Sequence, residues 1–168
     1  MGRTGKVYRR LRSAVTDKPT YFSWVIEEKL AASGLPSSAS QVRWLERNGI
    51  DSILSLTETP IPAKWFSGTK VSSKHISMED HAPPSAEKLQ EAADYIDLQL
   101  RDGKTVLVHC LAGIGRTGSS ISAYMIAYGG KSADEAIESL RGLRPGSVER
   151  AQENAVRDFA KHVKAGRR

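Results

Sequence analysis

Apolar residues recur along the chain in two spacings, short continuous runs typical of buried strands and a three-to-four-residue spacing typical of helices. The runs predict extended segments at 21–31, 50–57, 71–77 and 105–109. The helical spacing predicts helices within 38–48, 85–103, 116–128 and 132–143, and a last amphipathic helix that carries Ala155, Val156, Phe159 and Val163. Ser38 and Ser132 are each followed three residues later by Gln or Glu, which is the spacing of a capping box.

The order of these elements indicates the fold class. The run at 105–109 (TVLVH) is apolar almost throughout, as expected of a central parallel strand covered on both faces. Strands and helices alternate early and helices dominate late. We therefore predict an α/β fold, a small mainly parallel central sheet of about 4–5 strands with helices on both faces. The 168 residues fit one domain, predicted at 21–168, after a basic leader at 1–20.

Charge is concentrated at the two ends of the chain. The net charge is +6, of which residues 1–20 carry +5 and residues 157–168 carry +4, so that the body between them sums to −3. Basic ends of this kind can contact nucleic acid, although solvated ends that keep the protein soluble explain them more simply. There is no apolar run of the roughly 20 residues that a membrane span requires and no signal-peptide pattern. With one cysteine, no internal disulfide can form, and a cytoplasmic location is expected.

Two motifs overlap at 109–119 (HCLAGIGRTGS). One is G-x-G-x-x-G, a dinucleotide fingerprint, which requires a second strand about 20 residues later that ends in an acidic residue. Only helical pattern follows the motif, and this interpretation leaves Cys110 and Arg116 without a role. The other is C-x5-R, a cysteine at the end of a buried strand and an arginine at the start of a helix.

The C-x5-R interpretation predicts a phosphate-binding loop. Its backbone N–H groups can point inward at a helix N-terminus, and Arg116 adds a planar fork that can grip two phosphate oxygens. Cys110 is then expected to be a thiolate placed for in-line attack on phosphorus. His109 is expected to order the loop, and Thr117 to hydrogen-bond the sulfur or assist a second step. The predicted phosphate-binding set is Leu111, Ala112, Gly113, Ile114, Gly115 and Arg116.

The motif resembles the H-C-x-x-G-x-x-R-[ST] signature of the cysteine-dependent protein tyrosine phosphatase superfamily. Four further stretches are similar to small atypical dual-specificity phosphatases of the VHZ type, namely 21–36, LTE at 56–58, DHAPPS at 80–85 and RPGSVE at 144–149. The resemblance covers about residues 21–165. It implies a protein tyrosine phosphatase-like fold and a two-step hydrolysis of phosphate monoesters through a phosphocysteine on Cys110, with no metal and no cofactor.

The same resemblance suggests two further residues. Asp80 matches the general acid, which protonates the leaving oxygen and later deprotonates water. Its neighbour Glu79 is the alternative acid. Gln152 is a candidate for positioning that water, although its spacing from RPGSVE is shorter than expected. His81 beside Asp80 could orient it, or could simply be exposed.

The expected substrate is a phosphorylated protein, phosphotyrosine above all, with phosphoserine and phosphothreonine possible. Phosphate, vanadate or sulfate are the expected active-site anions. Leu111, Ala112 and Ile114 add no positive charge to the loop, which disfavours polyphosphoinositides. Other hypotheses are a phosphatase acting on RNA 5′-phosphates or on phosphoinositides, a pseudophosphatase that binds phosphate without turnover, and a sulfur-transfer module that uses the same cysteine.

Overall fold

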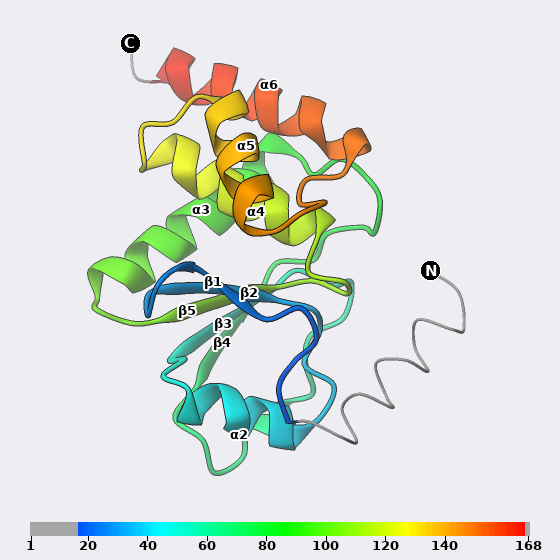
Figure 1. Cartoon of the computed structure of the whole chain (residues 1–168), viewed down its shortest axis with the longest axis vertical. Helices are drawn as coiled ribbons and strands as arrows, with labels where there is room; N and C mark the ends of the chain where they lie inside the picture. The colour runs from blue at the N-terminus through cyan, green and yellow to red at the C-terminus, as the bar shows by residue number, and fades with distance from the viewer. Residues whose placement is uncertain (1–16, 167–168) are drawn as a thin grey trace.

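The computed structural model describes residues 17–166 as a five-stranded sheet between two layers of helices (Figure 1). The strands are β1 (Ser23–Ile26), β2 (Leu30–Ser33), β3 (Ser52–Ser55), β4 (Ser72–His75) and β5 (Val106–His109). The helices are α2 (Ala39–Arg47), the 3-10 turn η1 (Ala63–Phe66), α3 (Ala86–Arg101), α4 (Gly115–Ala127), α5 (Ala133–Leu143) and α6 (Arg150–Gly166). The predicted leader falls mostly on residues 1–16, outside the described part.

The sheet has the order β1-β2-β5-β3-β4, and β5 lies in its centre. All pairings are parallel except that of β1 with β2. The α/β prediction and the central place of 105–109 are confirmed. The segment 21–31 is not one extended stretch, because the chain reverses after β1 and returns as β2, with Glu28 in a left-handed turn conformation at φ 55°.

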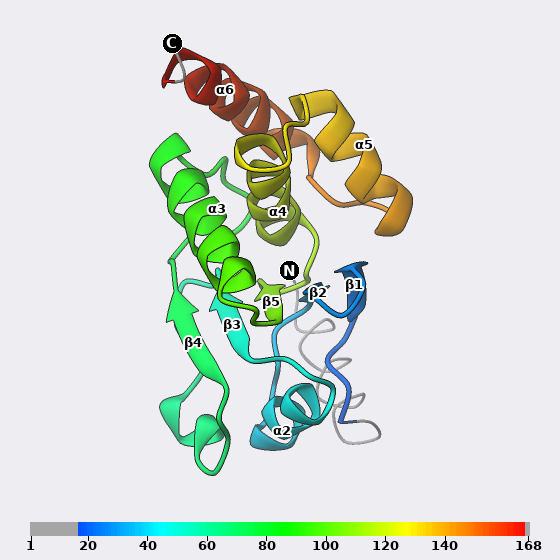
Figure 2. The same ribbon diagram turned by 90° about the vertical axis from the view of Figure 1, so that its left-hand side faces the viewer.

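Successive side chains of a strand point to opposite faces of the sheet, which divides the core into two layers. Val106 and Val108 face the layer covered by α3, α4, α5 and α6, whereas Leu107 faces the smaller layer under α2 and η1. Figures 1 and 2 show α3, α4, α5 and α6 on one side of the sheet and α2 on the other. Helices therefore cover both faces, as predicted. Among the described residues no helix is long and apolar enough to cross a membrane.

Serine caps start three of the helices. The side chains of Ser38, Ser85 and Ser132 each accept a hydrogen bond from the backbone N–H three residues later, which satisfies a donor that the helix leaves unpaired. Ser132 and Glu135 form the complete capping box. At α2 the box is only half formed, because Gln41 accepts from the N–H of Ser37 instead of that of Ser38.

The register of the parallel strands brings their ends to one level. Ser33 and Ser55 both lie opposite His109, and Ser55 also lies opposite His75. The segments that follow these four strand ends therefore meet at one edge of the sheet. In open α/β sheets this carboxyl edge is where ligands bind.

Candidate active site

The loop between β5 and α4 forms the floor of this edge. Cys110 is 2% exposed, and its Sγ accepts a hydrogen bond from the N–H of Gly113 at 3.2 Å. Gly113 has φ +78°, and a Cβ built on it would lie 2.4 Å from the Ser33 carbonyl. The loop therefore folds tightly around the sulfur only because this position is glycine.

The start of α4 is open to an anion. Ile114 stands at the N-cap and gives no side-chain hydrogen bond to the helix, unlike the serines that cap α2, α3 and α5. The N–H groups of the first turn carry the positive end of the helix dipole. An uncapped first turn directly after a cysteine loop is suited to bind a phosphate.

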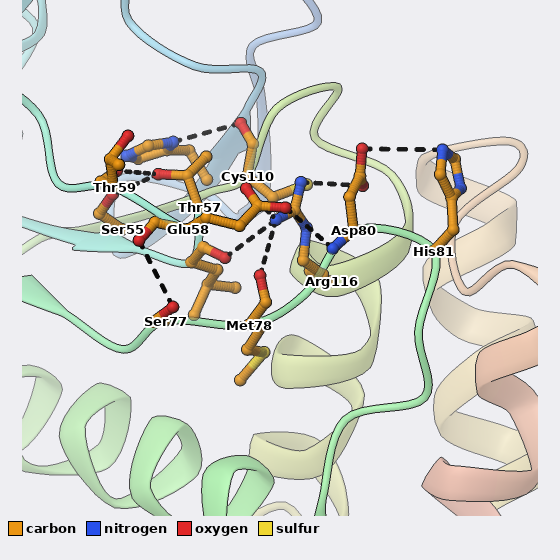
Figure 3. A network of polar contacts seen from close by, with 12 residues as sticks. Ser55, Thr57, Glu58, Thr59, Ser77, Met78, Asp80, His81, Cys110 and Arg116 are labelled. Atoms are coloured by element: carbon orange, nitrogen blue, oxygen red, sulfur yellow. Dashed lines mark hydrogen bonds and ion pairs between the residues drawn. The ribbon is translucent and has the colours of Figure 1, made fainter.

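Arg116 is the buried cation of the site, 1% exposed (Figure 3). Its Nη1 donates to the Met78 carbonyl at 2.9 Å and to Glu58 Oε2 at 3.1 Å. Its Nη2 lies 2.8 Å from Asp80 Oδ1, an ion pair without the alignment of a hydrogen bond. Within residues 17–166, Nε and Nη2 have no hydrogen-bond partner. One side of the guanidinium is thus fixed by the protein, and the other offers two donors to an oxyanion.

Asp80 lies in an irregular segment between β4 and α3. It is 31% exposed, and its N–H donates to Glu58 Oε1 at 3.0 Å. Its neighbour Glu79 is exposed and takes part in none of the ion pairs or side-chain hydrogen bonds of the described residues. Of the two acids considered from the sequence, Asp80 is the one that the structure places against Arg116.

Glu58 connects the acid segment to the arginine. Its two carboxylate oxygens contact Asp80 N and Arg116 Nη1, as Figure 3 shows. Partial burial raises the pKa of Glu58, but its own backbone N–H and the Arg116 guanidinium outweigh this, so the pKa is lowered overall. Sequence reasoning used Glu58 only as part of the LTE resemblance and assigned it no role. An acidic residue just beyond a buried strand was the available signal.

His81 lies beyond Asp80 and faces two carboxylates. Its Nε2 is 3.6 Å from Asp80 Oδ2, and its Nδ1 is 3.3 Å from Glu149 Oε2. The residue is 60% exposed and has φ 60°, an uncommon conformation for a residue with a Cβ. His81 is therefore exposed, and a role in orienting Asp80 stays a prediction.

His109 and Thr117 are both buried behind the loop. Burial lowers the pKa of His109 to about 4, and the charges of Arg116 and His75 act in the same direction, against the hydrogen bond to the Cys110 carbonyl. The ring is therefore neutral at pH 7, and Nδ1 carries the proton because it faces that carbonyl at 3.3 Å. Thr117 Oγ1 has no hydrogen-bond partner in the described part of the chain, so a bond to the sulfur is not among its contacts.

Gln152 reaches the same loop from the first turn of α6. It is fully buried, its Oε1 accepts from Glu149 N at 3.3 Å, and its Nε2 finds no partner within 17–166. A Cβ on Gly115 would lie 2.6 Å from both Gln152 Oε1 and Glu149 Oε2. The amide and the carboxylate thus pack directly against the loop, despite the short spacing noted in the sequence.

Arg144 was missed by sequence reasoning, which used it only within RPGSVE. It is 1% exposed, and its Nη2 donates to the Gly113 carbonyl at 2.8 Å. Its signal was an arginine before a Pro-Gly turn, a pattern that does not specify what the side chain contacts.

Among the described residues, no group of three His, Cys, Asp or Glu side chains could hold a metal ion.

A buried cysteine within a helix-start loop, a buried arginine and a facing aspartate on this sheet define the class of cysteine-based phosphatases. Residues 19–156 match the family described as "Swiss Army Knife protein, DSP-PTPase phosphatase domain" (PTP-SAK), and the chain belongs to this family.

Curated relatives support the same assignment. The chain is 34% identical over 109 residues to the tyrosine-protein phosphatase CDC14 of Candida albicans, covering 64% of this chain and 20% of the relative. It is 27% identical over 141 residues to the phosphatidylglycerophosphate phosphatase PTPMT1 of Arabidopsis thaliana, covering 83% of this chain and 42% of that relative. The chain therefore spans less than half the length of these relatives.

The fold also matches solved structures. The crystal structure of Tk-PTP in the active form superposes with a TM-score of 0.76 at 28% identity, covering 83% of this chain and 96% of that one. The protein tyrosine phosphatase-like fold expected from the sequence is confirmed.

Proposed function

We propose that this chain hydrolyses phosphate monoesters through a phosphocysteine intermediate on Cys110. The observation that carries the proposal is a pair of Arg116 donors, Nε and Nη2, that make no hydrogen bond within residues 17–166 and belong to the same site as a sulfur held inside an uncapped helix start. A tetrahedral dianion satisfies these donors and the loop N–H groups together.

In the first step the Cys110 thiolate attacks phosphorus. A P–S bond forms while the bond from phosphorus to the leaving oxygen breaks, and Asp80 gives its proton to that oxygen. Since Asp80 Oδ1 lies 2.8 Å from Arg116 Nη2, a bound phosphate displaces this carboxylate from the arginine. The displaced oxygen then faces a dianion, which favours the protonated acid that this step needs.

In the second step water attacks the phosphocysteine. Its oxygen bonds to phosphorus, the P–S bond breaks, and Asp80 accepts the proton that water loses, so that inorganic phosphate and the thiolate are released. The side chains of Gln152 and Glu149 lie against Gly115, which is a residue of the predicted phosphate-binding loop. The Nε2 of Gln152 makes no hydrogen bond to any described residue, which supports a role in positioning this water.

We infer a phosphorylated protein as substrate, with phosphotyrosine preferred and phosphoserine and phosphothreonine accepted. The half-buried loop side chains Leu111, Ala112 and Ile114 carry no charge, and Glu58 and Glu149 add negative charge at the rim. Such a rim disfavours substrates that carry several phosphates.

A lipid phosphate monoester is the second candidate, because PTPMT1, named as a phosphatidylglycerophosphate phosphatase, matches 83% of this chain. Hydrolysis of a phosphotyrosine peptide compared with that of phosphatidylglycerophosphate in mixed micelles separates the two. A higher kcat/KM for the lipid would overturn the protein-substrate assignment.

The chemistry is tested with p-nitrophenyl phosphate in EDTA, using wild type and Cys110→Ser. We expect turnover by wild type, none by Cys110→Ser, and no loss in EDTA. A radiolabelled substrate quenched with acid should leave phosphate on wild type alone. If wild type binds vanadate but does not turn over, the chain is a phosphate-binding pseudophosphatase, and if a persulfide forms at Cys110 instead, it is a sulfur-transfer module.

A further inference from the structure

Arg144 is a buried arginine that has no acidic partner among residues 17–166. It follows α5, and its Nη1 donates to the carbonyls of Tyr21 at 2.9 Å and Ala32 at 3.3 Å and to the hydroxyl of Ser23. The Tyr21 ring covers the guanidinium at 4.1 Å. All its hydrogen bonds go to neutral oxygens, and no ion pair among the described residues includes it.

A buried positive charge without a counter-charge is costly. Burial lowers the pKa of Arg144, whereas the charges that Tyr21 and Cys110 can carry raise it. Of these two groups, Cys110 lies in the loop that Arg144 contacts through the Gly113 carbonyl. A second anion in the same loop, the phosphate, would be stabilised in the same way.

Arg144 also fixes the shape of the loop. Gly113 donates its N–H to Cys110 Sγ and presents its carbonyl to Arg144 Nη2, so that both sides of this residue are tied. The peptide that follows is planar and trans, so its N–H, on Ile114, points away from the carbonyl that Arg144 holds. The N–H of Ile114 therefore points away from Arg144.

We propose, building on the proposed function, that Arg144 is a positioning residue of the phosphate loop and a second buried cation for the anions bound there. Arg116 reaches the bound anion directly and Arg144 acts from behind the loop, through the Gly113 carbonyl and through its charge. The two roles can be separated, since lysine keeps the charge but cannot reproduce the fork of contacts.

The test compares Arg144→Met and Arg144→Lys with Arg141→Met. Arg141 is a matched control because it also holds this turn, donating to the Ser147 and Val148 carbonyls, but does not contact the phosphate loop. The readouts are the rate of iodoacetamide alkylation against pH and the Kd for orthovanadate by calorimetry. Cys110 is the only cysteine, so alkylation reports on it alone.

For Arg144→Met we expect the pH of half-maximal alkylation to rise by about one unit, from the loss of a nearby opposite charge. Vanadate should bind about tenfold more weakly, which corresponds to the same free energy. For Arg144→Lys the alkylation midpoint should stay near that of wild type while vanadate still weakens. Arg141→Met should change neither. The groups that face the loop, His109, Arg116, Asp80 and Glu149, are the same in every variant.

A folded Arg144→Met protein with wild-type alkylation and wild-type vanadate binding would overturn the proposal. If that variant does not fold, Arg144→Lys decides the positioning role, and unchanged vanadate affinity there refutes it. Neither readout requires turnover. A wild-type protein that fails to hydrolyse p-nitrophenyl phosphate therefore refutes the proposed function and leaves this comparison valid.

Discussion

Asp80 Oδ1 and Arg116 Nη2 lie 2.8 Å apart, so the candidate acid occupies a nitrogen for which a bound phosphate would compete. A phosphate that takes this nitrogen also frees the carboxylate for proton transfer. Phosphate binding and the displacement of the Asp80 carboxylate from Arg116 are thereby coupled through one pair of atoms.

Replacing Asp80 should separate these two effects. We expect Asp80→Asn to lower kcat by about 10²–10⁴-fold and to remove the fall in rate at high pH, since the acid acts only when protonated. Inorganic phosphate should inhibit it more strongly than wild type, because no carboxylate then competes for Arg116. Steady-state kinetics across pH measure all three. Glu79→Gln is the matched control, and a larger loss there than in Asp80→Asn would assign the acid to Glu79.

Glu58→Gln should weaken the connection between the acid segment and Arg116. The amide oxygen can still accept from Asp80 N, but the charge opposite Nη1 is lost. Because Glu58 is half exposed, we expect a loss in kcat/KM of about fivefold. Glu46→Gln is the control, since Glu46 also accepts a backbone N–H, from Lys70, far from the site. An equal loss in kcat/KM for the two substitutions would show that Glu58 has no specific role in the site.

Gly113→Ala should destabilise the loop. The new Cβ meets the Ser33 carbonyl at 2.4 Å, and the φ of +78° is unfavourable for alanine, so we expect a cost of about 1–3 kcal/mol and loss of vanadate binding. Gly142→Ala in α5 meets no atom of the described residues within 4 Å and should be neutral or stabilising by about 0.5–1 kcal/mol. Urea denaturation gives both values. A Gly113→Ala protein as stable as wild type would contradict the loop geometry.

His109 should make the fold sensitive to acid. Its pKa is about 4 in the folded protein and about 6.5 unfolded, so the unfolded chain binds the proton more readily between these values. The contribution of neutral His109 to the free energy of unfolding is therefore complete above pH 6.5. It is lost as the pH drops toward 4, which lowers the free energy of unfolding by up to about 3 kcal/mol from this residue alone. His109→Gln should flatten that slope in urea titrations at several pH values. His162→Gln, on the exposed side of α6, should leave it unchanged.

Sequence patterns predicted those features that depend on neighbours in the chain. The serine caps, the central strand and the Cys110 loop each occupy one short stretch, and each was found. The β1–β2 reversal was not found, because Glu27, Glu28 and Lys29 carry no glycine or proline to mark a turn.

Contacts between distant segments were the harder part. Glu58 reaches Arg116 across 58 positions, and Arg144 reaches Tyr21 across 123. Such pairs follow from strand order and helix packing, which periodicity does not determine. The resemblance pointed to the segments that contain both residues but gave neither a role.

The strand ends Ser33, Ser55, His75 and His109 lie at one level, so the proposed catalysis depends on correct alignment of the strands. Cys110, Glu58 and Asp80 come from three separate stretches and meet only when each pairing is in register. A slip of one residue moves a group by about 3.3 Å and turns its side chain to the opposite face. Turnover by a refolded sample would therefore report that β3, β4 and β5 have all paired correctly, which a measurement of helix content alone does not.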